Sequence, residues 1–152
     1  MPTVSRTFTV KPPPKVVLGY LEDFSHAQQW DPGTQHCTRI GADPVGVGTQ
    51  WHNKSKILGV STELEYTLLE SKGDRVVFEG KNKSSTTVDT IVVTPAQSGS
   101  RIEYRADLRM HGLSVLATPM MKLVFEKLAG DTESQMIKVL NDLPADEVNN
   151  QR

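Results

Sequence analysis

Residues 10–30 read VKPPPKVVLGYLEDFSHAQQW, and this stretch predicts a proline-started helix followed by a second, very short one. The prolines Pro12–Pro14 end any strand before them, because proline has no N–H to give to a strand ladder. A proline is nevertheless well placed in the first turn of a helix. Ser25 and Gln28 have capping-box spacing for the short helix, which we expect to end at Trp30. Apolar residues at helical spacing predict about three turns for the first helix; they are Val17, Tyr20, Leu21 and Phe24.

Strand patterns lie on both sides of this helical stretch. Thr3–Val10 alternates between apolar and polar residues and predicts a half-buried first strand. Beyond Gly33 the hydrophobic period changes to two, and short turns separate the successive patterns. One apolar and one polar face per strand is typical of an antiparallel meander. The predicted strands are Gln35–Ala42, Thr49–Ile57, a strand after Gly59 that contains Glu63–Leu68, Arg75–Gly80, Thr86–Thr94 and Arg101–Met110.

The end of the chain returns to a helical pattern. Thr118 is the expected N-cap, with Pro119 at the first helical position. Gly130 and the capping-box spacing of Thr132 and Gln135 leave two abutting helices open, but we favour one helix, bent at Gly130, because the apolar face resumes beyond it. That face consists of Met120, Leu123, Val124, Leu128, Met136, Val139, Leu140 and Leu143.

Length and composition indicate an ordinary globular protein of the α+β class. The chain has 152 residues, of which 37% are hydrophobic and 23% charged, enough for one domain with a proper core. We expect a single domain over residues 1–144 and a polar C-terminal tail over residues 145–152. The formal charge of -1 argues against binding to nucleic acid.

Targeting features are missing from the sequence as well. No apolar run approaches the roughly 18–20 residues that span a bilayer, so we expect no integral membrane association. The first residues, MPTVSRTFTVKPPP, lack the basic and apolar regions of a secretory signal. The single cysteine, Cys37, cannot form an internal disulfide. The cytoplasm is therefore the expected location. The sequence does not indicate which oligomeric state the protein adopts.

The chain resembles the START-related superfamily called SRPBCC, in its polyketide cyclase/dehydrase-like branch. The resemblance lies in the order of these elements and in three local sequences: Val10–Trp30, Gly46–Trp51 (GVGTQW) and the final helix. The resemblance implies a helix-grip fold, in which a curved seven-stranded antiparallel sheet wraps a long C-terminal helix, with two short helices between the first and second strands. It also implies a START-like ligand-binding domain whose cavity takes hydrophobic or amphipathic small molecules. The family includes lipid carriers, polyketide aromatase/cyclases and subunits of hydroxylating enzymes.

No catalytic or metal-binding motif is visible in the sequence. The histidines and Cys37 lack ligand spacing, and His36 and Cys37 point to opposite faces of one strand, so they form no dyad. There is no nucleophile elbow and no phosphate-binding loop, and we expect no metal and no cofactor. The acidic residues Glu63, Glu65, Glu103 and Asp107 lie opposite the apolar positions of their strands and are expected on the outer face.

The inward-facing positions of the predicted strands and helix are the candidates for a ligand-binding cavity. They combine an apolar wall with a few polar groups, which is typical of a ligand pocket. The residues by themselves favour a simple hydrophobic core, and only the resemblance to the family makes a pocket an equal alternative. The candidates are Trp51, Asn53, Ser55, Leu64, Tyr66, Phe78, Thr90, Tyr104, Leu108, Met110, Leu116, Met120, Met121 and Val124.

The register of the Thr86–Thr94 strand is ambiguous, because apolar residues occur on both of its faces. With Thr90 inward, the neighbouring Asp89 faces solvent. In the other register Asp89 becomes a buried acid, whose pKa would be raised by desolvation and which would be a candidate base.

These patterns support three hypotheses of function. The first is binding or transport of a hydrophobic small molecule, lipid or polyketide-like, oriented by Asn53, Ser55, Tyr66 and Tyr104. The second is a polyketide cyclase/aromatase or dehydratase, which needs an acid or base facing the cavity; His52 or Asp89 turned inward would favour it. The third is a protein-interaction module without a ligand.

Overall fold

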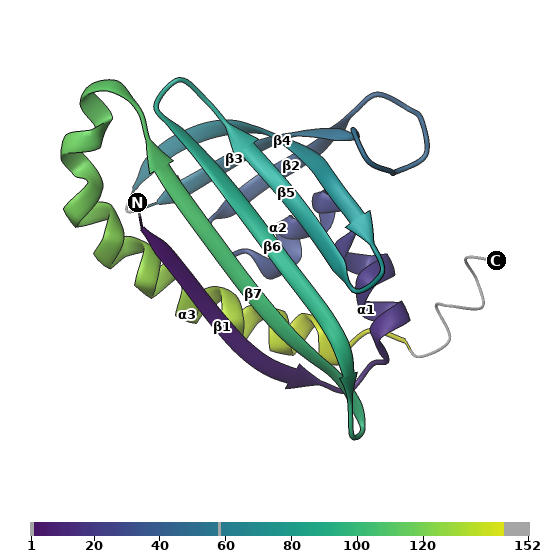
Figure 1. Cartoon of the computed structure of the whole chain (residues 1–152). Coiled ribbons are helices and arrows are strands. Elements are labelled where there is room, and N and C mark those ends of the chain that lie inside the picture. The colour runs from purple at the N-terminus through teal and green to yellow at the C-terminus, as the bar shows by residue number, and fades with distance from the viewer. Residues whose placement is uncertain (1, 58, 145–152) are drawn as a thin grey trace.

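The computed structural model describes residues 2–57 and 59–144. It contains a seven-stranded antiparallel sheet with the strand order β1-β7-β6-β5-β4-β3-β2. The sheet curves across the molecule, and the helices lie on one side of it (Figure 1). The strands are β1 Thr3–Val10, β2 Thr34–Ile40, β3 Gln50–Ile57, β4 Val60–Lys72, β5 Arg75–Lys81, β6 Ser85–Ala96 and β7 Gly99–Met110.

The helical elements follow the predicted order. Two α-helices and one 3₁₀ turn connect β1 to β2, and a 3₁₀ segment leads from β7 into the long final helix. The predicted helix-grip fold is thereby confirmed. The elements are α1 Pro14–Leu21, η1 Phe24–His26, α2 Ala27–Trp30, η2 Gly112–Ala117 and α3 Thr118–Asn141.

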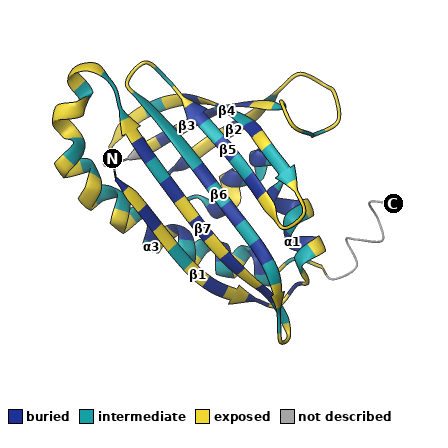
Figure 2. Ribbon diagram, in the orientation of Figure 1, coloured by how far each residue is buried: buried dark blue, intermediate teal, exposed yellow. Residues whose placement is uncertain are grey.

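Burial alternates along the strands, as the period of two predicts (Figure 2). In β7 the residues Ile102, Tyr104, Ala106 and Leu108 are buried, whereas the residues between them face outward. Because β1 pairs with β7 in register, with Val4 opposite Ala106, the buried face continues onto the first strand. One face of the sheet therefore forms the core side and points toward the helices.

The cap of the short helices differs from the prediction. Helix α1 ends at Leu21 after two turns, and Phe24 lies in η1. The cap of η1 is Asp23, whose Oδ1 accepts hydrogen bonds from the Ser25 N–H at 3.0 Å and the Ser25 hydroxyl at 2.7 Å. Ser25 thus lies inside the first turn and cannot cap it, because the capping position needs extended backbone.

Helix α3 is one continuous helix, as favoured, but its cap and its first half depart from the prediction. Ala117 is the N-cap and makes no side-chain hydrogen bond, so Thr118 belongs to the first turn. The second half is buried through Ala129, Thr132, Met136 and Leu140, whereas the predicted apolar residues Met120 and Leu123 are 68% and 75% exposed. The reason is that the second half packs on the core, while the first half lies beside a cavity.

Polar contacts hold α3 along β1 and α2. Arg6 forms an ion pair with Glu126 at 3.1 Å, the Lys11 N–H donates to Asn141 Oδ1 at 2.8 Å, and Gln135 Nε2 donates to the carbonyl oxygen of Gln29 at 3.0 Å. Among the described helices none is long and apolar enough to cross a membrane. The predicted tail from residue 145 lies outside the described residues.

Candidate functional site

A cavity of about 450 Å³ lies between the core face of the sheet and helix α3. Its volume falls within the roughly 300–1,000 Å³ typical of small-molecule sites. Most of its wall is apolar: β7 contributes Ala106, Leu108 and Met110, and α3 contributes Met121, Val124 and other side chains. The sequence left open whether the inward-facing residues fill a core or surround a pocket. The structure has a cavity between them.

The two ends of the cavity differ in exposure. At one end the wall includes Val60 and Met120, which are 67% and 68% exposed. At the other it includes Asp89 and Tyr104, which are 6% and 9% exposed. The mouth therefore lies between the start of β4 and the start of α3, and the polar side chains of Asp89 and Tyr104 lie at the inner end.

Asp89 faces the cavity, so the prediction that Thr90 lies inward is wrong and the alternative register is correct. The buried residues of β6 are Asp89, Ile91 and Val93, and Thr90 is on the opposite face. The partner strand decides this register, because β7 has a clear inward face and pairs Ala106 with Asp89. Apolar residues on both faces of β6 made the local pattern ambiguous.

The pKa of Asp89 is raised to about 8, mainly by burial and then by the negative charges of Asp31 and Asp107. A hydrogen bond from the Tyr104 hydroxyl acts in the opposite direction. At neutral pH the Asp89 carboxyl is therefore mostly protonated. A carboxylic acid whose pKa lies near neutrality can donate or accept a proton under physiological conditions.

Two tyrosines flank this acid. The pKa values of Tyr66 and Tyr104 are raised well above 10, first by burial and then by the charge of Asp89, so both phenols stay protonated. The Thr87 hydroxyl donates to the Tyr66 oxygen at 3.4 Å. Gly80 makes room for the Tyr66 ring, since a Cβ at this position would lie 2.6 Å from a ring carbon. The glycine thus fixes which way Tyr66 can lie.

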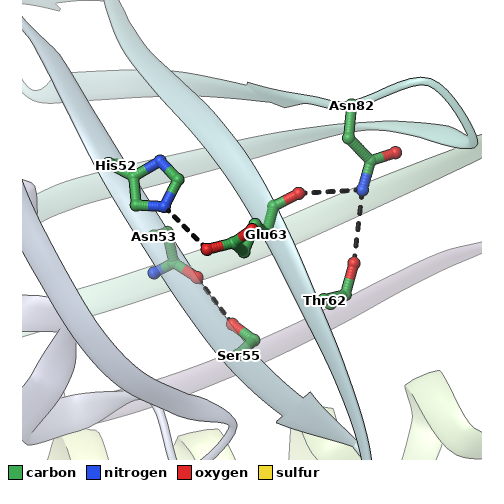
Figure 3. A network of polar contacts seen from close by, with 6 residues as sticks. All are labelled: His52, Asn53, Ser55, Thr62, Glu63 and Asn82. Carbon is green, nitrogen blue, oxygen red and sulfur yellow. Dashed lines mark hydrogen bonds and ion pairs between the residues drawn. The ribbon is translucent and has the colours of Figure 1, made fainter.

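A chain of polar side chains runs from β3 to Asp31 on the cavity wall. The Ser55 hydroxyl donates to Asn53 Oδ1 at 2.6 Å (Figure 3), and Asn53 Nδ2 donates to Thr34 Oγ1 at 3.1 Å. The Thr34 hydroxyl then donates to Asp31 Oδ2 at 3.0 Å, and the Gly33 N–H donates to Asp31 Oδ1 at 3.0 Å. Burial raises the pKa of Asp31, and these two hydrogen bonds oppose the rise.

The neighbouring residues of β3 and β4 point to the outer face or to the rim of the cavity. His52 forms an ion pair with Glu63 at 3.1 Å, away from Asn53 and Ser55 (Figure 3). Asn82 Nδ2 donates to Thr62 Oγ1 at 3.2 Å and to the Glu63 carbonyl at 3.0 Å, which ties the β5–β6 loop to β4. His52 is therefore not the inward acid or base that the sequence left open.

The structure brings most of the predicted cavity residues together. Those that lie on the wall are Ser55, Leu64, Tyr66, Tyr104, Leu108, Met110, Met120, Met121 and Val124.

The other predicted residues are elsewhere. Trp51 and Phe78 are fully buried in the aromatic core, with ring centroids 5.8 Å apart, and Asn53 is occupied by the polar chain. Leu116 is 83% exposed on η2 and is absent from the wall, because η2 continues beyond β7 before α3 turns back. The prediction of wall residues is therefore wrong for Trp51, Asn53, Phe78, Thr90 and Leu116.

Asp31 is the wall residue that sequence reasoning missed. It belongs to Asp31-Pro32-Gly33, which has the composition of an ordinary turn, and nothing local indicates that it faces an acid on a distant strand. Cys37 is buried, which raises the pKa of its thiol to about 12, so it is no nucleophile at neutral pH. Within residues 2–57 and 59–144, no three His, Cys, Asp or Glu side chains gather as a metal site would require.

The chain matches a family model over residues 1–136, and the description of that family is "Polyketide cyclase / dehydrase and lipid transport". A search of curated proteins finds no match.

Solved structures share the fold at low sequence identity. A START superfamily protein from Mycobacterium smegmatis has a TM-score of 0.78 and 14% identity, covering 93% of this chain and 99% of its own. A STAR-related lipid transfer protein from Xanthomonas axonopodis has a TM-score of 0.72 and 14% identity, over 92% and 86% of the two chains. The di-domain ARO/CYC protein StfQ of the steffimycin biosynthetic pathway has a TM-score of 0.70 and 10% identity, over 92% and 51%.

Proposed function

Since this chain belongs to the polyketide cyclase/dehydrase and lipid transport family of the START-related (SRPBCC) superfamily, we propose that it binds or carries a hydrophobic or amphipathic small molecule in its cavity. The observation that carries the proposal is the cavity of about 450 Å³ with an apolar wall and a buried polar end. Burial of apolar ligand surface supplies the driving force, at roughly 25 cal/mol per Å² before the costs of association.

Filling the cavity is expected to weaken this binding. Ala106 is 3% exposed and lies on the wall, so Ala106→Phe should occupy ligand space and weaken binding of the neutral fluorophore Nile red by at least about tenfold. Nile red fluorescence, titrated with protein, measures the effect. Ala129→Leu fills the cavity from the α3 side and should act in the same direction.

The matched control is Thr90→Phe, which adds a ring to the outer face of β6. It should bind Nile red as the wild type does, and thermal unfolding shows whether each variant is folded. If both cavity-filling variants fold and still bind Nile red with unchanged affinity, the cavity is not the binding site.

A second candidate function is that of a polyketide cyclase or dehydratase, and the inward position of Asp89 favours it. This residue and Tyr104 place a proton donor against the space where a bound poly-ketone would lie. Protonated Asp89 would give its proton to a departing hydroxyl, and the carboxylate left behind would take a proton from the adjacent carbon. Acid and base are then the same side chain at two stages of one dehydration.

The enzyme hypothesis predicts turnover of a synthetic poly-β-ketone thioester, with loss of water detected by mass spectrometry. Asp89→Asn should lower the rate about 10²–10⁴-fold, because an amide cannot transfer the proton. The wild-type rate should fall as the pH rises through about 8, since the acid form starts the reaction. A wild-type protein that binds the thioester and releases no water would count against an enzyme and leave the carrier function standing.

A further inference from the structure

Two acidic side chains, Asp31 and Asp89, line the cavity among neutral hydroxyl groups. Four of the hydroxyl groups that line or adjoin the cavity already give their protons to another protein group. The carboxyl groups of Asp31 and Asp89 are the strongest hydrogen-bond acceptors of the wall once they are ionised. The committed hydroxyls are those of Ser55 toward Asn53, Thr34 toward Asp31, Thr87 toward Tyr66, and Tyr104 toward Asp89.

Among the described residues, no positively charged side chain of the wall faces the two acids. Among the described residues that line the cavity there is no lysine, arginine or histidine. The titratable groups that interact electrostatically with Asp89 are all neutral or acidic. They are Tyr104 and Asp107 on β7, Tyr66 on β4 and Asp31 before β2. A charge on Asp89 therefore needs a partner that the described protein wall does not supply.

We propose that the molecule bound in this cavity carries an alkylammonium head group, which lies against Asp89 and Asp31 while its apolar part extends toward Met120 and the mouth. This inference rests on the proposed binding function and specifies the class of ligand. An ammonium group brings a positive charge, which the described wall lacks, and three N–H donors for the carboxyl oxygens.

The same arrangement disfavours anionic amphiphiles. A fatty-acid carboxylate or a phosphate would be buried without a cationic partner on the described wall, and any ionisation of Asp31 or Asp89 would repel it. A neutral alcohol has a single donor and forms no ion pair. The expected order of affinity is therefore amine, then alcohol, then carboxylate.

Binding of an ammonium group should also displace a proton. In the empty cavity Asp89 holds a proton near pH 7, because its pKa is about 8. When the ammonium group binds beside Asp89, the carboxyl proton is released to solvent and the ammonium group keeps all of its protons. An ion pair then replaces the neutral carboxylic acid. About one proton should be released per bound amine, and none per bound alcohol.

The test compares n-decylamine, 1-decanol and decanoate, which share one chain and differ in the head group. Isothermal titration calorimetry at pH 7, in two buffers of different ionisation enthalpy, measures both affinity and proton release. Decylamine is expected to bind at least about tenfold more tightly than decanol, with decanoate weakest. Asp89→Asn should lower the affinity for decylamine at least about tenfold and leave that for decanol unchanged.

The unchanged affinity of Asp89→Asn for decanol also shows that the variant is folded. Asp31→Asn should reduce the amine preference in the same direction, whereas Asp43→Asn, at an exposed loop position, should not. Equal affinities for the three compounds, or an amine preference that survives Asp89→Asn, would overturn the inference while the binding function stands. If none of the three compounds nor Nile red binds, the proposed function fails and the inference fails with it.

Discussion

Replacing Asp89 with asparagine is expected to remove most of the loss of stability that the wild-type protein undergoes between about pH 4 and pH 8. In the unfolded chain this carboxyl has its ordinary pKa of 3.8, whereas burial raises the pKa in the folded protein to about 8. Between these values the folded state holds a proton that the unfolded state has released. The free energy of unfolding therefore falls as the pH rises through this window and levels off above it.

The size of this effect follows from the span of the window. One pKa unit corresponds to about 1.4 kcal/mol, so the carboxyl accounts for about 3–6 kcal/mol of stability lost by pH 8. Asparagine has nearly the same shape, can still accept from Tyr104 and does not ionise. The variant should consequently be more stable than the wild type at pH 8, and the two should converge near pH 4.

Urea unfolding at several pH values measures the difference, with Asp43→Asn as an exposed control that should follow the wild type. Asp31 contributes in the same direction, since its pKa is also raised by burial, so some fall of stability with pH should remain in the variant. If wild type and Asp89→Asn lose stability in parallel from pH 4 to pH 8, Asp89 is not protonated in the folded protein.

Replacing Trp51 with alanine is expected to destabilise the fold by about 3–5 kcal/mol. Trp51 is fully buried and its indole N–H donates to Asp23 Oδ1 at 3.1 Å. Burial alone would raise the pKa of Asp23, but hydrogen bonds from Ser25 and Trp51 hold it below its ordinary value. Loss of the indole therefore leaves a large cavity and also weakens the cap of η1, so the two short helices lose part of their connection to the sheet.

A pair of phenylalanine variants separates the hydrogen bond from the packing. Trp30 is also buried, but its Nε1 has no hydrogen-bond partner among the described residues. Both Trp51→Phe and Trp30→Phe remove similar ring volume, and only the first removes a hydrogen bond to a charged group. We expect Trp51→Phe to cost about 1.5–3 kcal/mol more than Trp30→Phe in denaturant unfolding. Equal losses would mean that the Asp23 contact adds nothing to stability.

Where sequence reasoning about this protein succeeded, the pattern was local and unambiguous. In β7 every second residue is apolar, and these residues are buried. In β6 the apolar residues Val88, Ile91, Val92 and Val93 occur on both faces, so only pairing with β7 could place Asp89 inward. Asp31 was missed for a different reason, because its neighbours predict a turn correctly and say nothing of what the turn faces.

The amino-acid sequence by itself determined the order of the elements, the antiparallel sheet, the single final helix and the inward parity of most strands, because periodicity reports which side chains must leave water. Only the tertiary structure decided that the first half of α3 lies beside a cavity instead of on a packed core, and that Asp31 and Asp89 both line this cavity. The physical reason is that a pattern shows which face is buried, whereas the space between two buried faces depends on long-range packing. The two acids owe their raised pKa values to that same packing, which no local stretch of the chain contains.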